Sequence, residues 1–193
     1  MAVCVTAQAG DISGKVTAGG VSRIFNPSLH MYERAVVYVE AVPGKTFPAP
    51  ATPLLMDQRS LSFQPHILAA PAGSTVEFLN SDKVAHNIFW PSISGNKKLG
   101  RNLGTWPSGE KRAFKFETPG IVPLLCNAHS EMSGYIIVTP TPFYAETDAS
   151  GAFKIANVPA GSYTVTAWHE GFKTQSKPVT VAGQATVDFD LSK

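Results

Sequence analysis

The chain has 193 residues, of which 44% are hydrophobic and 16% charged, and its formal net charge is +2. This composition excludes a disordered chain and fits one large or two small packed domains. The basic residues form no long run of the kind that follows nucleic-acid phosphates. No segment approaches the ~20 apolar residues needed for a membrane span. We therefore expect a soluble protein that has neither a nucleic-acid partner nor a membrane span.

The first nine residues end in a small-x-small pattern at Ala7 and Ala9. This pattern is typical of the tail of an export signal and its cleavage site, although the basic start and most of the apolar stretch are missing. The alternative is a frayed terminus without function. Cleavage after Ala9 would remove Cys4 and leave Cys126 as the only cysteine. A lone thiol in an exported protein cannot form an internal disulfide, and metal ligation explains it best.

Further along the chain, short segments rich in β-branched and aromatic residues are separated by Gly, Pro, Asn and Asp. No long stretch shows a sustained helical apolar period. We therefore predict an all-β chain. The predicted strands begin with a segment at residues 10–16 and continue at 35–42, 74–79, 112–117, 134–139, 163–168 and 185–191.

One group of side chains has the chemistry of a metal site. Cys126, His129 and Met132 stand three residues apart, and His86 lies forty residues before Cys126. A thiolate and two imidazoles with a weak thioether ligand form the set that holds blue copper for electron transfer. Zinc in the same pocket and a chance grouping without metal remain as alternatives, and the methionine argues against zinc.

The flanking residues place this group on loops. Prolines at 119 and 123 precede the Cys126 run, and a β-branched segment starts directly after Gly134. Proline disfavours a helix here, so we expect Cys126 to Met132 on a tight loop between two strands. His86 is expected on a second loop at the same end of a sandwich.

Several neighbours of the predicted ligands are expected to tune or expose the site. Asn87 adjoins His86 and could hydrogen-bond the Cys126 loop, and Asn127 follows the cysteine. Phe89 and Trp90 could supply an apolar docking rim. Glu131 could add charge to that rim or compete as an oxygen ligand. Lys97, Lys98 and Arg101 would favour an acidic partner, or they form an ordinary solvated loop.

The ligand order resembles that of the cupredoxin family, with a loop spacing most similar to that of amicyanin. The resemblance covers residues 54–140 and implies a Greek-key β-sandwich with one type 1 copper ion, in a periplasmic electron carrier. Two departures stand out. Asn127 and Ala128 replace the Ser or Thr and Pro common after the cysteine, and Ser130 and Glu131 stand where relatives often have apolar residues or proline.

Residues from Thr147 onward resemble the later strands of carboxypeptidase regulatory-like domains, which are small β-sandwiches. The opening strands of such a domain occur at the other end of the chain. We therefore expect residues 10–45 and 141–193 to form one discontinuous sandwich, with residues 1–9 as a signal remnant. The copper domain, residues 46–140, would be inserted at a loop tip of that sandwich. A plain copper domain with irregular extensions is the alternative.

These features predict a monomeric electron carrier with an unidentified redox partner protein. Multicopper oxidases and copper nitrite reductases need further histidines for a second copper centre, whereas this chain has five in all, so we expect no enzyme. The alternatives are a copper-handling protein without a redox partner and a structural or adhesive module. His66 is expected at the surface, although Met56 and Asp57 nearby leave a second metal site open. His30 and His169 are expected to be surface or packing residues.

Overall fold

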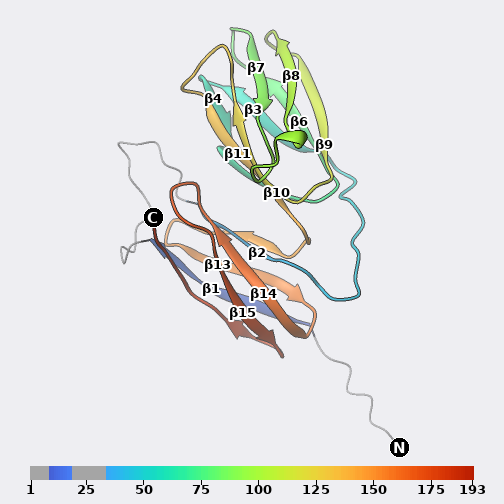
Figure 1. The fold of residues 1–193 in the computed structure, drawn as a ribbon, viewed down its shortest axis with the longest axis vertical. Helices are drawn as coiled ribbons and strands as arrows, with labels where there is room; N and C mark the ends of the chain where they lie inside the picture. Colours follow the sequence, from blue (N-terminus) through green and yellow to red (C-terminus); the bar gives the residue numbers. More distant parts are fainter. Residues whose placement is uncertain (1–8, 19–33) are drawn as a thin grey trace, which may run out of the picture. The chain divides into compact units, whose positions relative to one another are not determined.

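The computed structural model describes residues 9–18 and 34–193. The expected signal remnant therefore lies outside the described residues except for Ala9, and so does His30. The chain divides into two compact units. We call Phe47–Pro140 the middle unit, and the segments up to Thr46 and from Thr141 onward the flanking unit (Figure 1). Insertion of the middle unit into a loop of the flanking sandwich stays a prediction.

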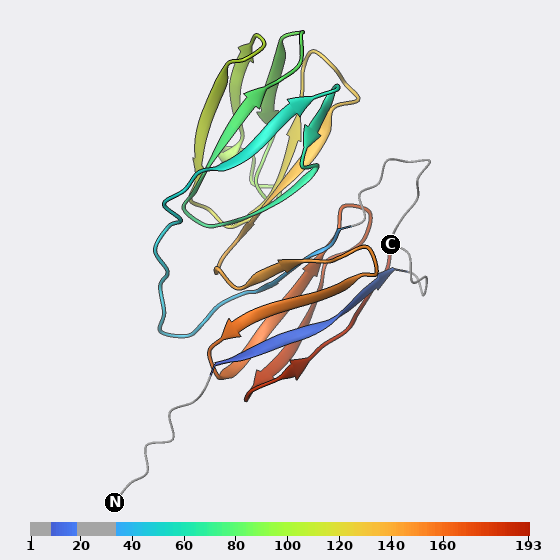
Figure 2. The same cartoon turned by 180° about the vertical axis from the view of Figure 1, so that it is seen from behind.

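The prediction of an all-β chain is confirmed. The only helical element among the described residues is the single 3₁₀ turn η2 (Lys97–Leu99), and each unit is built of strands (Figures 1 and 2). Nothing in the described part of the chain is a helix long and apolar enough to cross a membrane.

The flanking unit has two four-stranded sheets, with strand orders β13-β1-β16, where β17 also pairs with β1, and β12-β2-β14-β15. Strand β1 brings the beginning and the end of the described chain together by strand pairing. It pairs antiparallel with β13 and parallel with both β16 and β17. Apolar side chains of both sheets, including Ile12, Val37 and Val165, are fully buried. The strands are β1 (Gly10–Ala18), β2 (Val36–Val39), β12 (Tyr144–Glu146), β13 (Ala152–Val158), β14 (Gly161–Trp168), β15 (Gln175–Val181), β16 (Ala185–Thr186) and β17 (Phe189–Leu191).

The middle unit also has two sheets, with strand orders β5-β11-β10-β7-β8 and β4-β3-β6-β9. The predicted strand at 74–79 shows why they form: in β6 every second residue from Ser74 to Asn80 is buried, as expected for a strand with one face on a core. The strands are β3 (Leu54–Arg59), β4 (Ser62–Gln64), β5 (Ile67–Pro71), β6 (Ser74–Asn80), β7 (His86–Trp90), β8 (Arg101–Trp106), β9 (Lys111–Phe116), β10 (Gly120–Leu125) and β11 (Ser133–Thr139).

The core of the middle unit continues directly into the predicted site. Aromatic side chains fill its centre, with Trp90, Phe114 and Phe116 in mutual ring contact. Cys126 and Met132 belong to the same buried cluster. Two predicted ligands are therefore held by core packing, which limits the positions that their sulfur atoms can take.

Candidate metal centre

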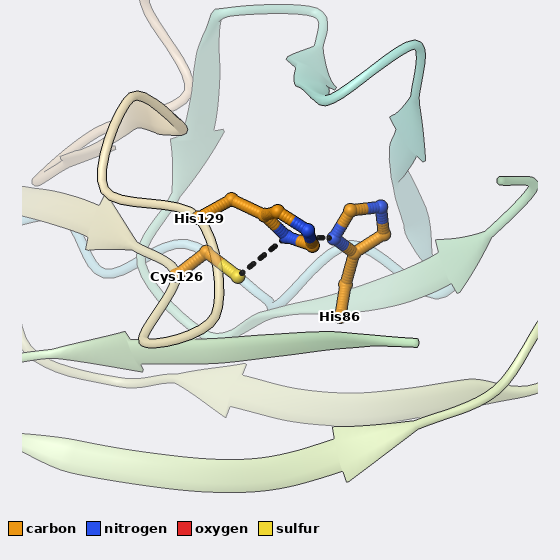
Figure 3. Close-up of side chains that lie close together, drawn as sticks. All are labelled: His86, Cys126 and His129. Carbon is orange, nitrogen blue, oxygen red and sulfur yellow. Dashed lines mark hydrogen bonds between the residues drawn. The ribbon is translucent and has the colours of Figure 1, made fainter. Parts of the chain in front are cut away.

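Three of the predicted ligands meet at one point. Nδ1 of His86 lies 3.0 Å from Nδ1 of His129, and that atom lies 3.8 Å from Sγ of Cys126 (Figure 3). His86 and Cys126 are buried and His129 is half-buried. Among the described residues this is the one cluster in which three or more His, Cys, Asp or Glu side chains bring ligand atoms within 4.8 Å of one another.

The spacing of these atoms fits a shared metal ion. Protein metal–nitrogen and metal–thiolate bonds are about 2.0 and 2.3 Å long. In a trigonal arrangement such bonds separate nitrogen from sulfur by about 3.7 Å and two nitrogens by about 3.1 to 3.5 Å, depending on the angle. The observed nitrogen–sulfur separation of 3.8 Å is close to the first value, and the observed nitrogen–nitrogen separation of 3.0 Å falls just below the second range. One thiolate and two imidazoles form the trigonal donor set that suits copper.

The strands explain why the ligands converge. Strand β10 ends at Leu125 and β11 begins at Ser133, so Cys126 to Met132 form the loop between two paired strands that the prolines and glycine predict. Within the loop, the backbone N–H of Met132 donates to the carbonyl of His129 over 3.1 Å. His86 is the first residue of β7, at the end of a strand rather than inside a loop.

Met132 remains the predicted axial ligand. Its side chain is 1% exposed and belongs to the core cluster that contains Cys126. A buried thioether beside a thiolate and two imidazoles completes the ligand types of a blue-copper site.

Asn87 connects the two ligand segments, as its position beside His86 suggested. Its Oδ1 accepts a hydrogen bond from the backbone N–H of Asn127 over 3.3 Å. Its Nδ2 donates to Oδ1 of Asn102 over 2.9 Å and to the carbonyl of Gly104 over 2.8 Å. Asn127 takes part through its backbone, while its own side chain is exposed.

The sequence reasoning missed Asp82, which contacts the other ring nitrogen of His86. Oδ2 of Asp82 lies 2.8 Å from Nε2 of His86. The only sequence signal was a carboxylate four residues before the predicted ligand, which is weak without knowledge of the loop conformation.

A tight turn holds the Asp82 carboxylate. The backbone N–H of Ser60 donates to Oδ1 over 2.6 Å, and that of Leu61 donates to Oδ2 over 2.9 Å. Both turn residues have φ of 55°, a conformation that costs a residue with a Cβ roughly 1–2 kcal/mol. Burial acts to raise the pKa of Asp82, but the Leu61, His86 and Ser60 hydrogen bonds outweigh it and hold that pKa below its ordinary value.

The structure corrects the prediction for Trp90 and places the other predicted rim residues. Trp90 is 1% exposed and its Nε1 donates to the carbonyl of Leu99, so this side chain cannot form part of a docking surface. Phe89 is half-buried and pairs with Leu125, directly before Cys126. Glu131 is exposed and is not among the clustered ligand side chains.

The predicted basic cluster lies away from the site. Arg101 pairs with Trp90, whereas His86, at the other end of β7, pairs with Trp106. Four residues of strand separate the two ends by about 13 Å. Lys97 and Lys98, on the turn before Arg101, share its end of the strand.

His66 and His169, the other histidines in the described part of the chain, do not join a metal cluster. His66 is 9% exposed and packs edge-on against Tyr135, so the expectation of a surface histidine was wrong. Pro65 and His66 lie between β4 and β5 rather than within a strand, so alternation between the two faces of a strand does not determine the burial of His66. Met56 is fully buried in the apolar core. His169 is also buried, and its ring packs against Phe172.

Two family models match parts of the chain. Residues 51–139 match the family of copper binding proteins, plastocyanin/azurin family, and residues 135–192 match the carboxypeptidase regulatory-like domain. The donor set and the first match together fit a type 1 copper site. Both resemblances identified in the sequence therefore have a matching family model, each over part of the chain.

Several solved structures are similar to part of the chain. A reduced variant of amicyanin is 17% identical with a TM-score of 0.42, covering 47% of this chain and 85% of amicyanin. A purple cupredoxin from Nitrosopumilus maritimus is 23% identical with a TM-score of 0.39, covering 45% of this chain and 99% of its own. A copper-containing nitrite reductase from Thermus scotoductus SA-01 is 23% identical with a TM-score of 0.42, covering 64% of this chain and 28% of the reductase. No curated protein matches the chain.

Proposed function

We propose that this chain, in which a plastocyanin/azurin-type domain is combined with a carboxypeptidase regulatory-like domain, is an exported, periplasmic electron carrier with one copper ion. The observation that carries the proposal is the convergence of His86 Nδ1, His129 Nδ1 and Cys126 Sγ. His86, Cys126 and His129 would hold the ion, and Met132 would contribute a weak thioether ligand. Bound copper would supply a one-electron Cu(II)/Cu(I) couple.

The protein residues would keep the geometry constant between the two oxidation states. Cys126 and Met132 are packed in the core, and the backbone N–H of Asn87 points to Sγ of Cys126 at 3.5 Å. Hydrogen bonding to the cysteine sulfur is one of the factors that set the potential of such a site. A fixed ligand frame means that little structural change accompanies electron transfer.

Half-buried His129 is the best candidate for the electron port, because the other two clustered ligands are buried. On the His86 side, exposed Leu61 and Val84 line an open surface pocket with Asp82, Arg59 and Lys83. Transient redox complexes use small interfaces that combine apolar contact with charge steering. We propose that these residues, with Phe89 and Glu131, contribute to docking of a redox protein on the monomeric carrier.

Electron transfer without catalysis is the simplest role for this site. The described residues bring together one metal-ligand cluster, whereas the copper enzymes considered above need a second copper centre. We therefore propose that the chain is not itself an enzyme.

Reconstitution with copper tests the proposal. The full chain with Cu(II) should show an intense thiolate-to-copper absorption band that disappears on reduction and returns on oxidation. Cys126→Ala should abolish the band, while Ser130→Ala, a change at an exposed position of the same loop, should retain it. A blue spectrum in Cys126→Ala would overturn the proposal.

Electron-exchange kinetics separate a carrier from a copper-handling protein. Fast self-exchange between oxidised and reduced protein is expected for the carrier. Tight Cu(I) binding without a reversible blue state would instead support copper handling. Absence of copper binding would favour a structural or adhesive role.

A further inference from the structure

The ring of His86 is contacted at both nitrogens. Nδ1 faces His129 at 3.0 Å, and Nε2 faces Oδ2 of Asp82 at 2.8 Å. A carboxylate near an imidazole nitrogen accepts its proton in a hydrogen bond. The Asp82 contact therefore favours the tautomer with hydrogen on Nε2, which leaves the lone pair of Nδ1 directed toward the ligand cluster.

Asp82 is itself fixed from two directions. The consecutive N–H groups of Ser60 and Leu61 donate to its two carboxylate oxygens. Its backbone N–H donates to Oδ1 of Asn80 over 3.0 Å. Asn80 is fully buried, and its Nδ2 donates to the carbonyls of Val84 and Trp106 over 2.9 and 3.0 Å. The carboxylate thus cannot turn away from His86 without losing several hydrogen bonds.

Ser60 and Leu61 form the two-residue turn of the β3–β4 hairpin, in which Arg59 pairs with Ser62. Such turns favour positive φ at both central residues, because this conformation matches the twist of the strands. Both residues take the left-handed region that glycine or asparagine usually occupies. In that conformation the two successive N–H groups converge on the Asp82 carboxylate. Charge-assisted hydrogen bonds of this kind are stronger than neutral ones, so they offset the unfavourable backbone.

We propose that Asp82, held by the Ser60–Leu61 turn, is a positioning residue that selects the ligating tautomer of His86 and places a negative charge beside the copper site. The proposal rests on the proposed copper function. Outer partners of metal-binding histidines orient the ring and raise its basicity. A nearby negative charge stabilises Cu(II) more than Cu(I), so Asp82 should lower the reduction potential.

Two substitutions separate the hydrogen bond from the charge. Asp82→Asn removes the charge and, with its amide nitrogen in the Oδ1 position, the hydrogen bond from Ser60. Its amide oxygen in the Oδ2 position still accepts from His86 and Leu61. Asp82→Ala removes the charge and all of these hydrogen bonds. Glu117→Gln is the matched control: it removes one charge from the same unit, next to Phe116, which pairs with Ser74 at the end of β6 remote from Asp82.

The first measurement uses the metal-free full chain. Two-bond ¹H–¹⁵N correlation spectra should show the Nε2–H tautomer of His86 in the wild type and in Asp82→Asn, and a mixture of tautomers in Asp82→Ala. An unchanged His86 tautomer in Asp82→Ala would overturn the tautomer role. If Asp82→Ala does not fold, loss of the Nε2–H tautomer in Asp82→Asn would overturn it and its retention would support it.

The second measurement uses copper. Asp82→Ala should bind copper ~10- to 100-fold more weakly, as for other outer partners of metal-binding histidines. Asp82→Asn should lose more affinity for Cu(II) than for Cu(I), which raises the potential, while Glu117→Gln should change neither. Equal potentials in the wild type and Asp82→Asn, or an equal shift in Glu117→Gln, would contradict the charge role. A wild-type chain that binds no copper would instead overturn the proposed function, and the tautomer measurement would still report on the Asp82 contact.

Discussion

The backbone N–H of Asn87 lies 3.5 Å from Sγ of Cys126, and the side-chain oxygen of Asn87 accepts from the N–H of Asn127 directly after that cysteine. One asparagine thus connects the segment of the first histidine ligand to the cysteine loop through its backbone and its side chain. Asn87 itself is buried, so its side chain is held in place by packing as well as by these contacts.

Asn87→Ala should therefore loosen the site and destabilise the middle unit. The substitution leaves the N–H of Asn127 and the carbonyl of Gly104 without this partner. Both residues are exposed, so each lost bond should cost about the net value of an ordinary hydrogen bond, ~1 kcal/mol. Denaturant unfolding of the metal-free chain would measure the loss of stability, and copper titration would measure the loss of affinity. Unchanged unfolding together with unchanged affinity would show that the two segments do not depend on Asn87.

Met132→Leu should keep the thiolate-to-copper band and raise the reduction potential. The thioether is the weak axial donor predicted here, and its removal disfavours Cu(II). A volume-conserving apolar exchange costs less than about 1.5 kcal/mol, so the fold should survive. Voltammetry is the measurement. Met56→Leu is the control, since Met56 is equally buried in the same core but is not a predicted ligand, and an equal shift there would remove the axial role from Met132.

Glu131→Gln should leave the copper spectrum unchanged but alter docking. Glu131 is exposed and stands apart from the ligand cluster, so competition as an oxygen ligand is not expected. Its charge should affect the encounter with a redox protein through screened long-range attraction or repulsion. The salt dependence of the electron-transfer rate would change. A shifted absorption band in Glu131→Gln would identify it as a ligand instead.

Tyr38→Phe should make the flanking unit more resistant to alkali. Burial, reinforced by the charge of Glu40, raises the pKa of Tyr38 to about 12 from an ordinary value of 10.0. Between these values the unfolded chain loses the phenol proton while the native chain keeps it, so stability falls as pH rises. Phenylalanine has no such proton. Unfolding between pH 9 and 12 should show a shallower decline in the variant, and an equal decline would contradict the assignment.

The features that could be predicted from the sequence are those that depend on residues close together in the chain. Prolines at 119 and 123 and the strand after Gly134 were enough to predict the loop of Cys126, His129 and Met132. Asp82 was missed because its role depends on a turn about twenty residues earlier, whose left-handed backbone is not evident from the Ser-Leu pair. Trp90 was misplaced for a similar reason: its burial results from packing against Phe114 and Phe116 on another strand.

The pairing of β1 with the last strands constrains the order in which the chain can fold during synthesis. Gly10–Ala18 pairs with β16 and β17, whose residues lie more than 170 positions later, so this sheet cannot close until nearly the whole chain has been made. The copper ligands all lie within Phe47–Pro140, a unit whose own strands pair only with one another. Domains generally fold as units while the chain emerges. The metal pocket can therefore be complete before the flanking sandwich exists, and copper could be bound by a chain that is still half folded.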